Sequence, residues 1–132
     1  PTVFGIDLSA WAYENAFIDS QTQMYTGDIS NDEMYNDPDA IKSWDLITAI
    51  DVLEHLDNEQ LEKTLKNMAK YGKRFIFSIP FAPDDSNLYN DKTHKQFRTK
   101  EEWIKLIESF GIKINETPSF WYFAHQILIG EK

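Results

Sequence analysis

Ionisable side chains gather in one short stretch of the chain, residues 44–56, which reads WDLITAIDVLEHL. An apolar run leads into Asp51, and the pair Glu54-His55 follows three positions later. Carboxylates and imidazoles accept hydrogen bonds and exchange protons, so they suit the lining of a ligand opening. Another histidine, His94, lies in a polar segment further along the chain. We therefore expect a functional site where these residues meet.

The elements that must position these groups alternate between strand-like and helix-like segments, which predicts an open α/β sheet in three layers, α/β/α. The apolar run at 44–50 is typical of a strand covered on both faces. We expect Asp57 or Asn58 to cap the middle helix, and Thr99 with Glu102 to form a capping box. The expected strands are 2–6, 23–25, 44–50 and 74–79, the expected helices are 9–19, 58–71 and 99–110, and 112–114 with 122–129 should close the sheet as an antiparallel hairpin.

Ligands of such sheets bind at the carboxyl ends of the strands. That edge should bring together Asp7, Asp28, Asp51 and the long polar segment 81–98. Polar segments of this length inside a domain are often functional. We expect the aromatic side chains in it, such as Phe81 and the Asn87–Tyr89 region, to be exposed and to wall a substrate pocket.

Composition limits the classes of protein to consider. The chain has 132 residues, of which 42% are hydrophobic, and this predicts one domain over 1–132. It has no cysteine and no apolar run near the roughly 20 residues of a membrane span, so we expect a cytoplasmic protein with no membrane partner. The net charge of −9 repels phosphate backbones, which disfavours nucleic acid and leaves small molecules or neutral and basic surfaces as substrates.

Three stretches of the chain have a distinctive order and spacing: Gly5-Ile6-Asp7-Leu8-Ser9, Gly27-Asp28-Ile29 and the run from Trp44 to Leu56. Together they resemble the class I S-adenosylmethionine-dependent methyltransferases. The segments Thr93-His94, Thr99–Trp103 and Phe110–Ile112 are similar to the closing section of that family. The resemblance extends over essentially the whole chain. It implies a Rossmann-like sheet, mostly parallel with a C-terminal antiparallel hairpin, and S-adenosylmethionine as cofactor.

The resemblance also implies roles for single residues. Asp7, with its neighbour Leu8, matches the acidic position that binds the cofactor's ribose, since two carboxylate oxygens can accept two hydroxyl donors. Asp28 and Ile29 match the position beside the adenine. Asp51 to Leu53 match the segment at the methionine end of the cofactor and the substrate opening, with Asp51 and Val52 as the expected cofactor contacts.

One part of the family pattern is absent from the sequence. The family has a glycine-rich turn after a first, central strand, and both would precede Pro1. We therefore expect the chain to be the C-terminal portion of a longer methyltransferase. The alternative is a short variant in which the strand at 2–6 pairs directly with the strand at 44–50.

The activity that the resemblance implies is methyl transfer to an oxygen or nitrogen of a small acceptor by in-line displacement. His94 is the first candidate for the base that such an acceptor needs, and His55 is the second. We expect no metal site, because the sequence has no H-x-x-x-H pair, and we expect a structural role for His125. A non-catalytic scaffold with the same fold is the alternative function, and a dinucleotide enzyme is a weaker one.

Overall fold

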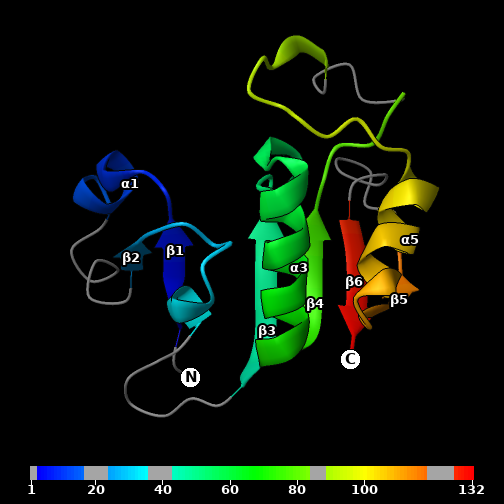
Figure 1. Cartoon of the computed structure of the whole chain (residues 1–132), viewed down its shortest axis with the longest axis horizontal. Helices are drawn as coiled ribbons and strands as arrows, with labels where there is room; N and C mark the ends of the chain where they lie inside the picture. The colour runs from blue at the N-terminus through cyan, green and yellow to red at the C-terminus, as the bar shows by residue number, and fades with distance from the viewer. Residues whose placement is uncertain (1–2, 17–23, 36–42, 84–88, 119–126) are drawn as a thin grey trace.

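The structure is a computed structural model, and it describes residues 3–16, 24–35, 43–83, 89–118 and 127–132. Strands, helices and 3-10 turns (η) alternate along these residues (Figure 1). In chain order the elements are β1 (Gly5–Asp7), α1 (Ala10–Glu14), β2 (Met24–Thr26), η1 (Asp32–Tyr35), β3 (Trp44–Ile50), η2 (Leu53–His55), α3 (Asn58–Tyr71), β4 (Gly72–Ser78), α5 (Lys100–Ser109), β5 (Lys113–Glu116) and β6 (Ile127–Glu131). The predicted α/β class is confirmed.

The strands form two hydrogen-bonded groups. β3, β4, β6 and β5 make a four-stranded sheet in that order, in which β3 and β4 are parallel and β6 runs antiparallel to both of its neighbours. This confirms the antiparallel pairing predicted at the C-terminal end. β1 and β2 form a separate parallel pair, which lies beside β3 in Figure 1.

No hydrogen-bonded pairing joins β1 to β3 among the described residues, so the predicted alternative in which these two strands pair is wrong. Side chains bring the two groups of strands together instead. The Phe4 ring lies edge-on to the Trp44 ring, with 5.2 Å between their centroids. This contact joins the two groups of strands where β1 and β3 begin.

The main core lies between the four-stranded sheet and the helices α3 and α5. Asp57, one of the two predicted caps, closes α3 through a capping box, and Leu61, Leu65 and Met68 of this helix are buried. Thr99 and Glu102 form the capping box of α5, which buries Trp103 and Ile107. Phe75 and Phe77 of β4 contribute stacked rings to the same core. Figure 1 shows α3 in front of β3 and β4, with α5 beside β5 and β6.

The prediction that β3 is covered on both faces is wrong. Side chains alternate along a strand, and Ala49 points into the core with only 4% of its surface exposed. Leu46 and Ile50 point the other way and are 47% and 53% exposed, because no described element covers that face of β3. An apolar sequence alone does not reveal whether a neighbour covers a face.

The predicted helix over 9–19 is also longer than the one observed. Ser9 caps it as expected, but α1 ends at Glu14, where the Asn15 backbone N–H and side-chain Nδ2 both donate to the Trp11 carbonyl at 3.0 and 2.9 Å. Asparagine favours such a helix end because its side chain competes for backbone partners. None of the residues of α1 is buried, and Trp11 is 70% exposed.

Candidate functional site

A hollow of about 270 Å³ opens where the ends of β1, β2 and β3 meet. It is lined by Ile6, Asp7, Leu8, Gly27, Asp28, Ile29, Asp51, Val52, His55, Leu56, Gln60 and Lys95. All six residues that the sequence singled out for cofactor binding are in this set. The ends of β1, β2 and β3 therefore meet at one edge, as predicted.

Asp7 and Asp28 sit in two successive turns at this edge. Oδ1 of Asp7 accepts a hydrogen bond from the Ser9 backbone N–H at 2.7 Å, and the Asp7 side chain is exposed. Oδ1 of Asp28 accepts from the Ser30 N–H at 2.8 Å, and this bond keeps the pKa of Asp28 below its ordinary value. Oδ2 of Asp28 accepts from the Gln60 side chain at 3.4 Å. Asp28 therefore presents a carboxylate fixed at both oxygens.

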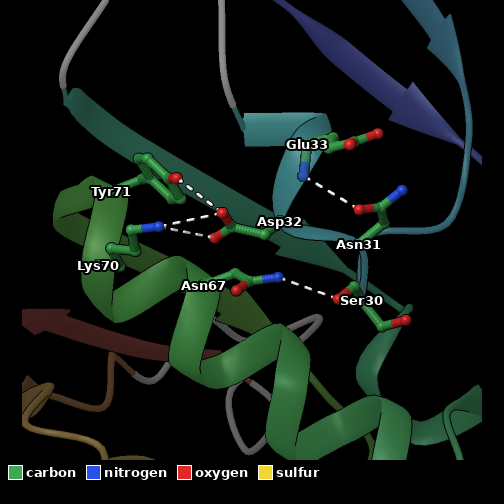
Figure 2. A network of polar contacts seen from close by, with 7 residues as sticks. All are labelled: Ser30, Asn31, Asp32, Glu33, Asn67, Lys70 and Tyr71. Atoms are coloured by element: carbon green, nitrogen blue, oxygen red, sulfur yellow. Dashed lines mark hydrogen bonds and ion pairs between the residues drawn. The ribbon is translucent and has the colours of Figure 1, made fainter.

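The segment that carries Asp28 is held against α3 by a network of polar contacts (Figure 2). Asp32 accepts two hydrogen bonds of 3.0 Å from Lys70 and one of 3.1 Å from the Tyr71 hydroxyl. The Asn67 side chain donates to the Ser30 carbonyl at 3.1 Å. These contacts fix the turn after β2 relative to the helix that follows β3, so they align two walls of the hollow.

Asp51 lies where β3 ends, with a φ of +50°, in the left-handed region that few non-glycine residues adopt. Its backbone N–H donates to the Ser78 carbonyl at 3.0 Å, and its Oδ1 accepts from the Ser78 hydroxyl at 2.9 Å. Aspartate tolerates this conformation better than most residues because its side chain bonds locally. After this turn, Val52 and His55 line the hollow, whereas Leu53 and Glu54 between them are buried.

Glu54 is the residue in this region whose importance sequence reasoning missed. It is only 1% exposed, and among the described residues its Oε2 has no hydrogen-bond partner. Burial raises the pKa of Glu54 to about 7, and the nearby Asp51 adds to the rise. The sequence noted the Glu54-His55 pair, but the short turn η2 that buries one member and leaves the other at the hollow has no recognisable pattern.

His55 and His94 come together although they lie in distant parts of the sequence. Their ring centroids are 4.6 Å apart at an interplanar angle of 62°. The backbone N–H groups of Lys95 and Gln96 both donate to the Glu54 carbonyl, at 2.8 and 3.1 Å. These two bonds hold the end of the polar segment against η2, and so they place the two imidazoles side by side.

Thr93 and Asp91 complete the surroundings of these rings. The Thr93 hydroxyl lies 2.9 Å from Nδ1 of His55 and donates to Oδ1 of Asp91 at 2.6 Å. Hydrogen bonds from Thr93 lower the pKa of Asp91. Nε2 of His94 lies 3.8 Å from Oδ2 of the same carboxylate. Sequence reasoning did not anticipate Thr93 or Asp91 as partners of the histidines, because their contacts depend on how the segment folds back.

The aromatic wall expected in the polar segment is not seen at the hollow, since neither Phe81 nor Tyr89 belongs to its lining. Phe81 is 2% exposed and belongs to the core, so its prediction as an exposed aromatic is wrong: it follows a buried strand and continues inward. Tyr89 is 56% exposed and stacks on Phe97. Asn87 and His125 lie outside the described residues.

Comparison with known proteins gives results only at the level of structure. No family model matches the sequence, and no curated protein matches it either. Among solved structures, a SAM-dependent methyltransferase from Archaeoglobus fulgidus superposes with a TM-score of 0.72 at 17% identity, over 98% of this chain and 75% of that one.

Other methyltransferases are similar to the same extent. Magnesium protoporphyrin IX methyltransferase from Synechocystis PCC 6803, solved with bound SAH, gives a TM-score of 0.67 at 20% identity over 98% of this chain and 64% of its own. The small RNA methyltransferase HEN1 gives 0.71 at 18% identity, over 98% of this chain and 20% of its own. The chain thus covers three quarters or less of each of these proteins, and it has the fold of the class I S-adenosylmethionine-dependent methyltransferases.

Proposed function

We propose that the protein transfers a methyl group from S-adenosylmethionine to an oxygen or nitrogen of a small-molecule acceptor. The observation that supports this most is the common location of Asp7, Leu8, Asp28, Ile29, Asp51 and Val52 in one hollow. The hollow's volume, about 270 Å³, lies just below the range of about 300–1,000 Å³ for small-molecule sites. A cytoplasmic location is part of the proposal, and none of the described helices has the length and hydropathy of a membrane span.

The chemistry of the three carboxylates suits the three parts of the cofactor. Asp7 is exposed, and its backbone partner occupies Oδ1 only, so Oδ2 can accept from a ribose hydroxyl. Asp28 and Ile29 would border the adenine, with the carboxylate at the ring edge and the apolar side chain at its face. Asp51 and Val52 would border the methionine portion.

In the transfer step, a lone pair of the acceptor oxygen or nitrogen attacks the methyl carbon of the sulfonium. The carbon–sulfur bond breaks, and its electron pair goes to sulfur, which leaves as S-adenosylhomocysteine. The acceptor's proton goes to an imidazole, with His94 as the first candidate and His55 as the second. His55 borders the hollow, and the His94 ring lies against the His55 ring, so both imidazoles are near the place where the acceptor would bind.

The net charge of −9 supports a small acceptor over nucleic acid, because a field of this sign repels phosphate groups. The fold alone leaves this question open, since the similar structures include a small RNA methyltransferase as well as a porphyrin methyltransferase. The alternative function is a non-catalytic scaffold with the same fold.

Titration calorimetry with S-adenosylmethionine and S-adenosylhomocysteine separates the two functions. We expect binding by the wild type and at least tenfold weaker binding by Asp7→Ala. Asp45→Ala is the matched control, because Asp45 is an exposed carboxylate on β3 that pairs with Lys73 at 2.7 Å and does not line the hollow. A folded protein that binds neither compound would support the scaffold.

A further inference from the structure

We propose that Glu54, His55 and His94 form a binding site for a divalent transition-metal ion of the zinc type. Each of the three offers one ligand atom, and these atoms all lie within 4.8 Å of one another. Two imidazole nitrogens and one carboxylate oxygen are a donor set that proteins use for zinc and related ions, with further positions left open.

Glu54 gives the strongest reason to expect a cation here. Its side chain is buried, and Oε2 has no hydrogen-bond partner within the described structure. A buried carboxylate oxygen without a partner is unfavourable, and proteins usually satisfy such an atom with a donor or a metal ion. A cation held between Glu54 and the two imidazoles would supply the missing partner.

The surroundings of His55 resemble those of a metal-bound histidine. Its Nδ1 is engaged by the Thr93 hydroxyl, which in turn bonds to Asp91. Metal-binding histidines commonly use one ring nitrogen for the ion and the other for a hydrogen bond that fixes the ring. Nε2 of His55 is therefore the nitrogen that remains for an ion.

The three groups need only a small adjustment to bind one ion. Ligands at about 2.1 Å from a tetrahedral zinc ion lie about 3.4 Å apart, compared with the 4.8 Å that bounds the present separations. Glu54 and His55 are fixed by η2, whereas His94 belongs to the polar segment that folds back onto it. Rotation of the side chains, the His94 ring above all, would close the site.

Sequence reasoning led us to expect no metal, because it looked for two histidines spaced along one helix. Here the donors come from two segments, the turn after β3 and the segment after β4, and hydrogen bonds to the Glu54 carbonyl join them. Such a set can be recognised only when the fold is known.

The ion would also bear on the transfer reaction, and this step alone rests on the proposed function. Since His55 borders the hollow, the ion's open positions would face the acceptor and could bind its oxygen. The two imidazoles would then act as ligands, and the ion rather than a histidine would make the acceptor's oxygen easier to deprotonate. Metal-dependent activity would support this role of the ion in the reaction. Activity that is unchanged by complete metal removal would exclude the role, while the proposal that the three residues bind a metal ion would still stand.

The site is tested by metal binding without cofactor. The protein is stripped with a chelator, dialysed, and titrated with Zn²⁺ by calorimetry and with Co²⁺ by visible absorption, which reports the geometry of the bound ion. We expect one equivalent bound per chain, at least tenfold weaker binding in each of His55→Gln, His94→Gln and Glu54→Gln, and about 10–100-fold weaker binding in Thr93→Val.

The matched control is Asp28→Asn, which removes a carboxylate of the same hollow outside the proposed ligand set and should leave the affinity unchanged. Circular dichroism identifies any variant that fails to fold. If Glu54→Gln unfolds, the substitutions of His55 and His94, which are less buried than Glu54, still test the site. A folded wild type that binds no ion would overturn the proposal. So would binding that the histidine substitutions leave unchanged.

Discussion

Thr93 links His55 to Asp91, with its hydroxyl 2.9 Å from Nδ1 of the ring and 2.6 Å from the carboxylate. The pKa of Asp91 is lowered, so at neutral pH this carboxylate only accepts hydrogen bonds. The single hydroxyl proton of Thr93 is therefore committed to Asp91. Toward His55 the hydroxyl can only accept, and the ring must carry its hydrogen on Nδ1.

This relationship predicts the tautomer of His55. In the metal-free protein, the neutral ring should be protonated at Nδ1, with the Nε2 lone pair available to an ion or to a proton. Long-range ¹H–¹⁵N correlation spectra distinguish the two tautomers. In Thr93→Val the accepting hydroxyl is lost, and the His55 signals should move toward the Nε2-protonated form. A wild-type spectrum with the hydrogen on Nε2 would contradict the hydrogen-bond direction argued above.

The exposed face of β3 gives a prediction about stability. Leu65→Ala empties a fully buried position in α3 and should lower the free energy of unfolding by about 2–5 kcal/mol. Leu46→Ala is the same substitution at a position that is 47% exposed, and it should cost about 1 kcal/mol or less. Urea denaturation followed by circular dichroism measures both. Equal losses would mean that something covers Leu46 in solution.

The difference between Leu65 and Leu46 also shows which features the sequence predicts and which it does not. Period and capping identified α3 closely, because the Asp57 cap, the Leu61 and Leu65 stripe and Gly72 are local signals. The apolar run of β3 predicted a strand with the right bounds, but not which face is covered, since burial depends on neighbours.

The candidate site divides in the same way. Asp7, Asp28 and Asp51 each follow a strand, and parallel strands end at one edge, so their meeting could be predicted. The contacts of His55 and His94 could not, because they depend on how a long segment folds back onto η2. Glu54 was hidden for the same reason: in the sequence it is a charged residue like any other, and only the fold buries it.

A side chain at Gly27 should destabilise the protein because of the close approach of Met34. A Cβ added at Gly27 would collide with Sδ of Met34, whereas one added at Gly5 would meet only an ordinary contact, with Met24 at 3.4 Å. Gly27→Ala should therefore cost about 1–3 kcal/mol of stability, and Gly5→Ala, the matched control, clearly less.

The collision itself can be tested with a double substitution. If overpacking against Met34 causes the loss, then Gly27→Ala combined with Met34→Ala should cost less than the sum of the two single changes, by about 0.5 kcal/mol or more. Thermal unfolding of the four proteins in the cycle measures this coupling. Strict additivity would show that the cost of Gly27→Ala has another origin.

Gln96 should be the side chain that holds the polar segment to the body of the protein. It is 4% exposed, its Nε2 donates to the Leu56 carbonyl at 2.8 Å and to Asn58 at 3.2 Å, and its Oε1 accepts from Arg98 at 3.0 Å. Gln96→Ala leaves these partners without their bonds, and we expect a loss of about 1–3 kcal/mol.

The same substitution should also disturb the site, because Gln96 lies two residues from His94 and shares the Glu54 carbonyl with Lys95. Hydrogen exchange should become faster at two amides where the polar segment meets η2. They are the amide of Lys95, which bonds to the Glu54 carbonyl, and the amide of Leu56, which bonds to the Leu53 carbonyl. Gln60→Ala is the control: it removes the same side chain from a partly exposed position, where the bonds are 3.3 and 3.4 Å long. Gln60→Ala should leave the hydrogen-exchange rate of the Lys95 amide unchanged. If Gln96→Ala left both stability and the Lys95 amide unchanged, the segment would have to be held by the backbone bonds to Glu54 alone.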